Sequence, residues 1–260
     1  MNNHFIIISH RRSGTHLTID SIINNFNLYK DKSYINIDRL RSDHKDVLTL
    51  ENVEDDINKG PTIIKSHLLP CFNRYFFNDE EKQNFINKLF FEAKKIYVYR
   101  DGRDVMASLY NYFNTFDEDT QKKTFKQFLR STSSTEQFIN DVNHIEFWKL
   151  HIKSWMNIND KNIMFISYEN LLNDYEETLK KIEKFLKIEI NNNITDVRMK
   201  KGIWYKIKNR LPRNKNIKRT VVTFNRGKTK NYLKYFDQED LIFFNKIVKN
   251  IQKKLDYKVT

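Results

Sequence analysis

The stretch FIIISHRRSGTHL, from Phe5 to Leu17, decides the fold of this chain. Its first part is an apolar run rich in β-branched residues, which predicts a buried strand, and a basic turn with one glycine then leads into a helical pattern. A strand that enters a helix through such a turn directs several backbone N–H groups and the positive end of the helix dipole at one point. The sequence therefore predicts a phosphate-binding turn over residues 11–15.

Further along the chain, short apolar runs alternate with helical patterns. Strands are expected at Thr62–Lys65, Lys95–Tyr99 and Ile163–Ile166, and helices at Thr15–Asn25, from Gly102 onward, at Asp117–Asn143, as one amphipathic helix carrying Leu171 to Leu186, and at Asp237–Leu255. Such alternation predicts βαβ units, so we expect an α/β fold of three layers, with helices on both faces of a central parallel sheet. Each expected strand ends in polar residues, and ligands of such sheets bind beyond the carboxyl ends of the strands.

Composition and charge narrow the class of protein. The 46 Lys and Arg residues exceed the 33 Asp and Glu residues, a net charge of +13 that suggests an anionic partner, although most of the lysine is diffuse and typical of a solvated basic surface. The single cysteine, Cys71, excludes an intramolecular disulfide, and no Cys/His cluster has zinc spacing. We expect one domain over residues 1–260, with no metal, no membrane span and a cytoplasmic location.

The turn Arg11-Arg12-Ser13-Gly14-Thr15 lacks the G-x-x-x-x-G-K-[ST] pattern of nucleoside-triphosphate P-loops. An ordinary helix start with a hydroxyl N-cap remains one interpretation of Ser-Gly-Thr. Arg12 favours an anion site instead, because a guanidinium beside that turn would be poorly placed unless an anion were bound.

Five segments, in order along the chain, resemble the motifs of the cytosolic-type sulfotransferases, which use 3′-phosphoadenosine 5′-phosphosulfate (PAPS). Arg12 to Thr15 resembles the 5′-phosphosulfate loop of that family, and IIKSHL (63–68) resembles its strand with a lysine and the catalytic histidine. The later segments are YVYRDGRDVMASLYNYF (97–113), similar to the 3′-phosphate motif, ISYENLL (166–172), similar to the segment beside adenine, and FNRGKTKNYLKYF (224–236), similar to the C-terminal loop. The resemblance implies a P-loop-like sulfotransferase fold and the activity of a PAPS-dependent sulfotransferase.

The resemblance also implies the residues of catalysis. His67 becomes the base that takes the proton of the acceptor hydroxyl, and Lys65 and Arg12 act on the transferring sulfonate and the leaving phosphate oxygen. Other interpretations remain open, since a single histidine is more often a surface or core residue and Lys65 could be an exposed lysine at a strand end.

The residues that would bind PAPS follow from the same motifs. The 5′ side is assigned to Arg11, Arg12, Ser13, Gly14, Thr15 and His16, the 3′-phosphate to Arg100, Ser108, Arg226, Gly227 and Lys228, and adenine to Tyr168. Gly102 is expected to permit a sharp reversal. The alternatives are a surface ion pair of Arg100 with Asp101 or Asp104, helix packing for Ser108, and the core for Tyr168. The family usually has proline and lysine at Arg11-Arg12 and tryptophan at Leu17.

The sequence does not identify the acceptor. The walls of the acceptor site are expected in Leu69–Phe77, Asn111–Val142 and Trp204–Thr223. A phenol or other small molecule, a sugar, a lipid or a peptide hydroxyl would each fit their mixed composition. Two other classes remain as alternatives. A small-molecule or nucleotide kinase would need a GK[ST] loop and a metal-binding carboxylate, neither of which is evident, and a nucleic-acid-binding protein would need one extended basic face.

Overall fold

A computed structural model describes residues 4–30, 32–41, 47–76, 78–133, 139, 141–198 and 229–257 of the chain. The expected ligands Arg226, Gly227 and Lys228, and the expected acceptor segment Trp204–Thr223, lie outside these residues.

The described part of the chain contains a five-stranded parallel sheet in the order β2-β3-β1-β4-β5. The strands are β1 (Phe5–Ser9), β2 (Tyr34–Asn36), β3 (Ile63–Ser66), β4 (Lys94–Tyr99) and β5 (Ile163–Ser167). The four strands expected from the sequence are present, which confirms the α/β class. Only β2 was missed, because three residues are too few for a periodic pattern.

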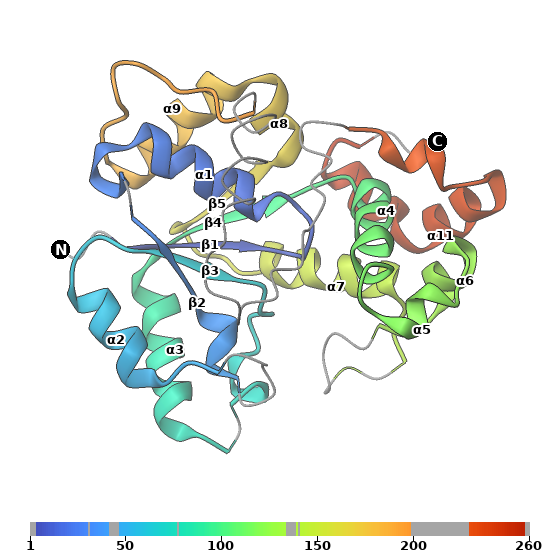
Figure 1. Cartoon of the computed structure of the whole chain (residues 1–260), viewed down its shortest axis with the longest axis horizontal. Helices are drawn as coiled ribbons and strands as arrows, with labels where there is room; N and C mark the ends of the chain where they lie inside the picture. Colours follow the sequence, from blue (N-terminus) through green and yellow to red (C-terminus); the bar gives the residue numbers. More distant parts are fainter. Residues whose placement is uncertain are drawn as a thin grey trace, which may run out of the picture.

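Helices cover both faces of the sheet, as Figure 1 shows. The helices α1 (Thr15–Asn25), α8 (Tyr168–Asn173) and α9 (Tyr175–Leu186) lie on one face, and α2 (Leu50–Asn58), α3 (Glu80–Glu92) and α7 (His144–Met156) lie on the other. Alternate side chains of β1 lie on opposite faces of the sheet. Phe5 and Ile7 belong to the hydrophobic core under α1 and α9, and Ile6 and Ile8 belong to the core on the other face. The three-layer architecture is therefore confirmed.

Four helices pack together on the side of the molecule where β4 ends (Figure 1). They are α4 (Gly102–Phe113), α5 (Glu118–Gln121), α6 (Phe125–Arg130) and α11 (Gln238–Lys254). Short 3₁₀ turns complete the described structure: η1 (Asn27–Tyr29), η2 (Ile37–Leu40), η3 (Phe72–Arg74) and η4 (Asn231–Lys234). The helix expected at Asp237–Leu255 is confirmed as α11.

Two helix predictions were wrong in their continuity. The single helix expected through Leu171 and Leu186 is two helices, because Asp174 leaves the helical conformation at φ −121° and ψ 50° between α8 and α9. Among the described residues of the stretch Asp117–Asn143, only α5 and α6 are helices, and a capping box at Thr124 starts α6 separately. After α6 the backbone is extended, and Thr132 pairs with Asn143 in an antiparallel bridge. At Thr124 a short polar side chain accepts from the Gln127 N–H, which explains the separate start of α6.

Gly102 has a different role from the expected reversal. Its φ is not positive, and a Cβ there would lie 2.8 Å from Phe244 Cζ and 2.9 Å from Trp148 Cη2. The residue is therefore glycine because α4 begins against two core rings, and not because a turn or a ligand requires it.

Buried histidines predict acid sensitivity of the fold. His144 and His151 are 7% and 0% exposed, and burial lowers the pKa of each to about 4. The unfolded chain takes up these protons near pH 6.5, so each histidine stabilises the fold fully above pH 6.5 and loses that contribution as pH falls toward 4.

We expect the free energy of unfolding in urea to fall by about 2 kcal/mol per buried histidine between pH 7 and pH 5. The variant His144→Phe keeps the stack on Phe128, whose ring centroid lies 4.1 Å away, and should show a shallower pH dependence. Equal slopes for the two proteins would contradict the expectation.

Candidate functional site

The turn between β1 and α1 has the features of an anion site. Arg12 and Gly14 adopt left-handed backbone conformations, with φ of 68° and 110°, and the Ser13 N–H donates to the His10 carbonyl over 3.2 Å. Gly14 is the N-cap of α1 and has no side chain to cap it, so the hydroxyl N-cap interpretation is wrong. The uncapped N–H groups of the first helical turn remain available to an anion.

Ser13 supports the same conclusion. Its side chain is fully buried, and within the described residues its Oγ has no hydrogen-bond partner. Leaving a buried hydroxyl unsatisfied costs about 1–3 kcal/mol, so such a group marks a place where a ligand or water completes the structure. Thr15, the next hydroxyl along the turn, is already bonded through Oγ1 to Ser9 Oγ over 2.5 Å.

Gly14 is tightly enclosed by Tyr168. A Cβ at Gly14 would lie 2.5 Å from Tyr168 Cδ2, and the φ of 110° already disfavours any other residue. Gly60 offers a matched comparison, because its φ is 130° while nothing lies within 4 Å of a Cβ there.

We expect Gly60→Ala to cost about 1–2 kcal/mol of stability from backbone strain alone. Gly14→Ala should cost about 1–3 kcal/mol more, because it adds overpacking against Tyr168. Urea unfolding of the two variants measures the difference. Equal losses would mean that the Tyr168 ring moves aside freely.

His67 follows directly after β3 and has a defined tautomer. Its Nδ1 lies 2.7 Å from the Ser9 carbonyl oxygen, which can only accept, so Nδ1 carries the proton and Nε2 keeps its lone pair. Burial, together with the positive charges of Lys65 and Arg11, lowers the pKa of His67 well below 6.5. The ring is therefore neutral at pH 7, as a general base must be.

Lys65 lies two residues before His67, inside β3 and 7% exposed. The interpretation as an exposed strand-end lysine is therefore wrong. Burial lowers its pKa, and the negative charge of Asp38 opposes that shift. The ammonium group of Lys65 is thus largely shielded from solvent and lies close to His67, the candidate base.

Arg12 has protein partners, which corrects the argument that only an anion could place it. Its Nε donates to Ser108 Oγ over 3.1 Å, and its guanidinium carbon lies 4.9 Å from the centroid of the Tyr112 ring. Burial lowers the pKa of Arg12, and the neighbouring Arg100 charge adds to this effect. The side chain therefore connects the turn to α4, where the sequence placed the 3′-phosphate ligand Ser108.

Arg100 follows β4 and is 7% exposed. Its Nη2 lies 3.5 Å from Asp104 Oδ2, its Nη1 donates to the Arg12 carbonyl over 3.4 Å, and its guanidinium carbon lies 4.3 Å from the Tyr168 ring centroid. The ion-pair interpretation identified Asp104 correctly, but the pair is buried and not at the surface. Asp104 also accepts from the backbone N–H groups of Lys230 and Tyr232, which holds η4 beside α4.

The structure thus brings most of the expected site residues together. Arg12, Ser13, Gly14, Arg100, Ser108 and Tyr168 form one connected cluster, with His67 bonded to the end of β1. Tyr168 is buried, as the core interpretation held, yet it lies between Gly14 and Arg100. His16 instead packs its ring against Tyr34, 5.7 Å between centroids.

Two residues in contact with His67 had not been identified from the sequence. The Asp38 carboxylate accepts from the His67 N–H over 2.9 Å and 3.1 Å, and His151 Nε2 donates to the His67 carbonyl over 3.0 Å. Asp38 belongs to no motif, and His151 lies 84 residues away along the chain, so no local pattern could have identified them.

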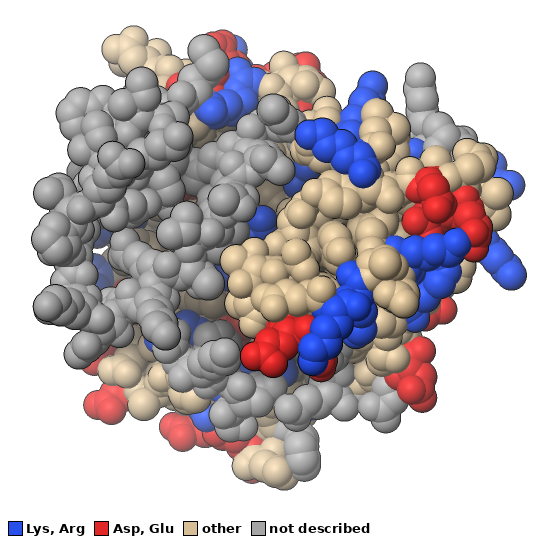
Figure 2. All heavy atoms as spheres, turned by 45° about the vertical axis from the view of Figure 1, so that its right-hand side comes forward, with Lys and Arg blue, Asp and Glu red and all other residues tan. Residues whose placement is uncertain are grey.

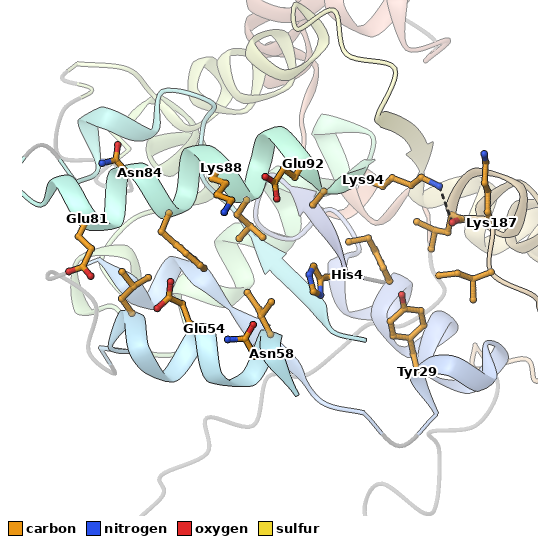
Figure 3. Close-up of a pocket in the computed structure, with 18 residues that line it drawn as sticks. His4, Tyr29, Glu54, Asn58, Glu81, Asn84, Lys88, Glu92, Lys94 and Lys187 are labelled. Carbon is orange, nitrogen blue, oxygen red and sulfur yellow. Dashed lines mark hydrogen bonds between the residues drawn. The ribbon is translucent and has the colours of Figure 1, made fainter. Parts of the chain in front are cut away.

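A groove of about 890 Å³ lies elsewhere, between α2 and α3 (Figure 3). His4 lies in this groove just before β1, whereas His67 bonds to Ser9 at the other end of that strand. Glu54, Glu92 and Lys88 surround it, so its lining has charges of both signs. The groove is therefore separate from the His67 cluster.

Basic and acidic side chains are interspersed on one face of the molecule. On the face turned forward in Figure 2, Lys and Arg side chains lie next to Asp and Glu side chains over the described residues. Among the helices in the described ranges, none has the length and apolar character needed to cross a membrane.

Comparison with known sequences identifies relatives. The model of the sulfotransferase domain family matches residues 2–257. Sulfotransferase 2B1 of Mus musculus is 32% identical over 142 residues, which are 54% of this chain and 36% of that protein. The amine sulfotransferase of Oryctolagus cuniculus is 26% identical over 160 residues, 61% of this chain and 48% of that protein. The matched region thus spans less than half the length of either relative.

Comparison with solved structures shows the same fold. The mouse sulfotransferase SULT7A1, crystallised in complex with PAP, has a TM-score of 0.61 and 19% identity, with 98% of this chain and 86% of that chain covered. A retinol dehydratase in complex with retinol and PAP has a TM-score of 0.57 and 17% identity, covering 99% and 83% of the two chains.

Proposed function

Because the chain belongs to the sulfotransferase domain family, we propose that it transfers the sulfonate group of PAPS to an acceptor hydroxyl, with His67 as the general base. The observation that carries the proposal is the state of His67. Its proton is on Nδ1, which donates to the Ser9 carbonyl at the end of β1, and the ring is neutral, so Nε2 can accept a proton. The anion turn, residues 11–15, follows β1 directly, so His67 lies close to it.

The residues of the turn fit a phosphorylated ligand. Anionic oxygens would complete the unsatisfied Ser13 hydroxyl and the uncapped start of α1, and the neighbouring guanidinium groups of Arg12 and Arg100 add positive charge beside them. We assign the 5′ phosphosulfate to Arg11, Arg12, Ser13, Gly14, Thr15 and His16, the 3′-phosphate to Arg100 and Ser108, and adenine contact to Tyr168. By resemblance, Arg226, Gly227 and Lys228 complete the 3′ site.

PAPS supplies the sulfonate group and, in its phosphate, the leaving group. His67 Nε2 takes the proton of the acceptor hydroxyl, and the Ser9 carbonyl then stabilises the positive ring through the Nδ1–H bond. Lys65 and Arg12 provide the positive charge that offsets the negative charge developing on the leaving oxygen. The low exposure of Lys65 strengthens that effect, because nearby water does not screen it.

The acceptor is the least determined part of the proposal. The names of the relatives include an amine sulfotransferase and a 3-alpha-hydroxysteroid sulfotransferase, so small-molecule acceptors are known in the family. We propose a hydroxyl-bearing small molecule for this chain, and the acceptor screen described below includes sugar, lipid and peptide hydroxyls as further arms.

Isothermal titration and an acceptor screen test the proposal. The protein should bind 3′-phosphoadenosine 5′-phosphate (PAP) more tightly than ATP or a single-stranded oligonucleotide, and labelled PAPS should transfer its label to at least one acceptor in the screen. A preference for ATP would favour the kinase alternative, and oligonucleotide binding with a steep salt dependence would favour a nucleic-acid-binding protein.

A further inference from the structure

The peptide groups on both sides of His67 are held by side chains from distant elements. Its N–H donates to both oxygens of Asp38, which lies in η2, and its carbonyl accepts from Nε2 of His151, which lies in α7. The ring makes a third bond, from Nδ1 to the Ser9 carbonyl. Since β3 ends at Ser66, His67 is the first residue beyond the sheet, where strand pairing no longer fixes the backbone.

We propose that Asp38 and His151 are positioning residues for the base, which clamp the main chain at His67 so that its ring keeps the Nδ1–H tautomer and leaves Nε2 as the proton acceptor. The consequence for turnover rests on the proposed function. The effect on the His67 ring does not, because it can be observed without nucleotide or acceptor.

His151 is suited to this role by its own bonds. A carbonyl oxygen can only accept, so His151 Nε2 must carry a proton toward His67, and its Nδ1 lies 2.7 Å from the Tyr97 hydroxyl. His151 is fully buried, and burial lowers its pKa to about 4, so the ring is neutral and Tyr97 donates to Nδ1. The hydrogen bonds therefore run in one direction, from β4 through His151 to His67.

Asp38 organises the other side of the same turn. Its side chain is 6% exposed, and besides the His67 N–H it accepts from Ser66 Oγ over 3.2 Å. Ser66 Oγ in turn accepts from the Leu68 N–H over 3.1 Å. Bonds from N–H groups to a carboxylate are stronger than those to a neutral acceptor, so this buried charge fixes residues 66–68 firmly.

The other charged and titratable groups that face His67 are Lys65, Arg11 and His151. The Lys65 and Arg11 side chains carry only hydrogen-bond donors, so neither can replace Asp38 as the acceptor of the His67 N–H. Displacing a general base by about 1 Å can lower the reaction rate as much as a hundredfold. The bonds of Asp38 and His151 to the His67 main chain therefore matter for catalysis as well as for folding.

The test compares three variants with a matched control. His151→Leu removes the donor to the His67 carbonyl, His151→Gln keeps an amide donor, and Asp38→Asn keeps the shape of the carboxylate but removes its charge. The control Trp155→Phe removes a similar bond one turn later on α7, from Nε1 to the Leu68 carbonyl over 3.0 Å.

Two measurements are made on each protein: ¹⁵N chemical shifts of the His67 ring without nucleotide, and steady-state rates with PAPS and an acceptor found in the screen. We expect His151→Leu and Asp38→Asn to move the ring shifts toward a tautomer mixture and to lower kcat by roughly tenfold to a hundredfold, with the KM for PAPS changed less than about threefold. His151→Gln should restore most of the rate, and Trp155→Phe should leave the ring shifts unchanged.

Unchanged His67 ring shifts in His151→Leu, or shifts that Trp155→Phe reproduces, would overturn the proposal. If His151→Leu does not fold, Asp38→Asn decides by the same measurement. If the wild-type protein neither binds PAP nor transfers sulfonate, the proposed function fails, while the ring shifts still decide whether Asp38 and His151 position His67.

Discussion

His67→Ala is expected to lower kcat by roughly 10²- to 10⁴-fold, the range typical for loss of a general base. The dissociation constant of PAP should stay within about threefold of the wild-type value, because the anion turn is held by bonds that do not involve the His67 ring. Those bonds include the contact of Ser9 with Thr15 and the contact of Arg12 with Ser108. Steady-state kinetics and calorimetric titration measure the two quantities separately.

His144→Phe is the matched control for this experiment. His144 is also a buried histidine of lowered pKa, but its ring stacks on Phe128 in the cluster of α6 and α7. It should therefore keep nearly full turnover near pH 7.5. Full activity in His67→Ala would remove His67 from the role of base, and a loss of PAP binding as large as the loss of rate would mean that the substitution damages the nucleotide site.

Arg100→Ala is expected to weaken PAP binding by roughly 10- to 100-fold, which corresponds to about 1.5–3 kcal/mol for hydrogen bonds to a charged group. Adenosine 5′-monophosphate, which lacks the 3′-phosphate, should lose less than about threefold. The substitution leaves Asp104 satisfied, since that carboxylate still accepts from the N–H groups of Lys230 and Tyr232. The structural damage should therefore be limited.

Arg103→Ala controls for the removal of a buried arginine close by in the chain, at the start of α4. Arg103 is 3% exposed, pairs with Asp101 over 2.6 Å, and lies with its guanidinium carbon 4.4 Å from the Tyr232 ring centroid. It should lower stability without changing the preference for the 3′-phosphorylated nucleotide. Equal losses of both nucleotides in Arg100→Ala would exclude Arg100 from the 3′ site.

The parts of the fold that follow local rules could be predicted from the sequence. Apolar runs ending in polar residues identified four strands, and the turn with Gly14 marked the start of α1. The prediction failed where a few residues decide the outcome. Asp174 separates α8 from α9, and β2 is only three residues long, so its pairing with β3 depends on a partner that lies distant in sequence.

In the candidate site too, local patterns could be predicted from the sequence and contacts between distant residues could not. The motifs made His67, Lys65 and Arg100 candidates, because each lies at or next to a strand end that a pattern marks. The partners of these residues could not be identified this way. The bond from Arg12 to Ser108 spans 96 residues and that from His151 to His67 spans 84, and such contacts exist only once the sheet has assembled.

The residues of the candidate site follow both inner strands and edge strands of the sheet. The anion turn, His67 and Arg100 follow β1, β3 and β4, each of which pairs with a strand on both sides, whereas Asp38 and Tyr168 follow the edge strands β2 and β5. Amide hydrogen exchange in the three inner strands should therefore require global unfolding, while the edges exchange through local opening. A substitution near the β2 edge should therefore alter the surroundings of His67 and leave the pairing of β1 with β4 intact.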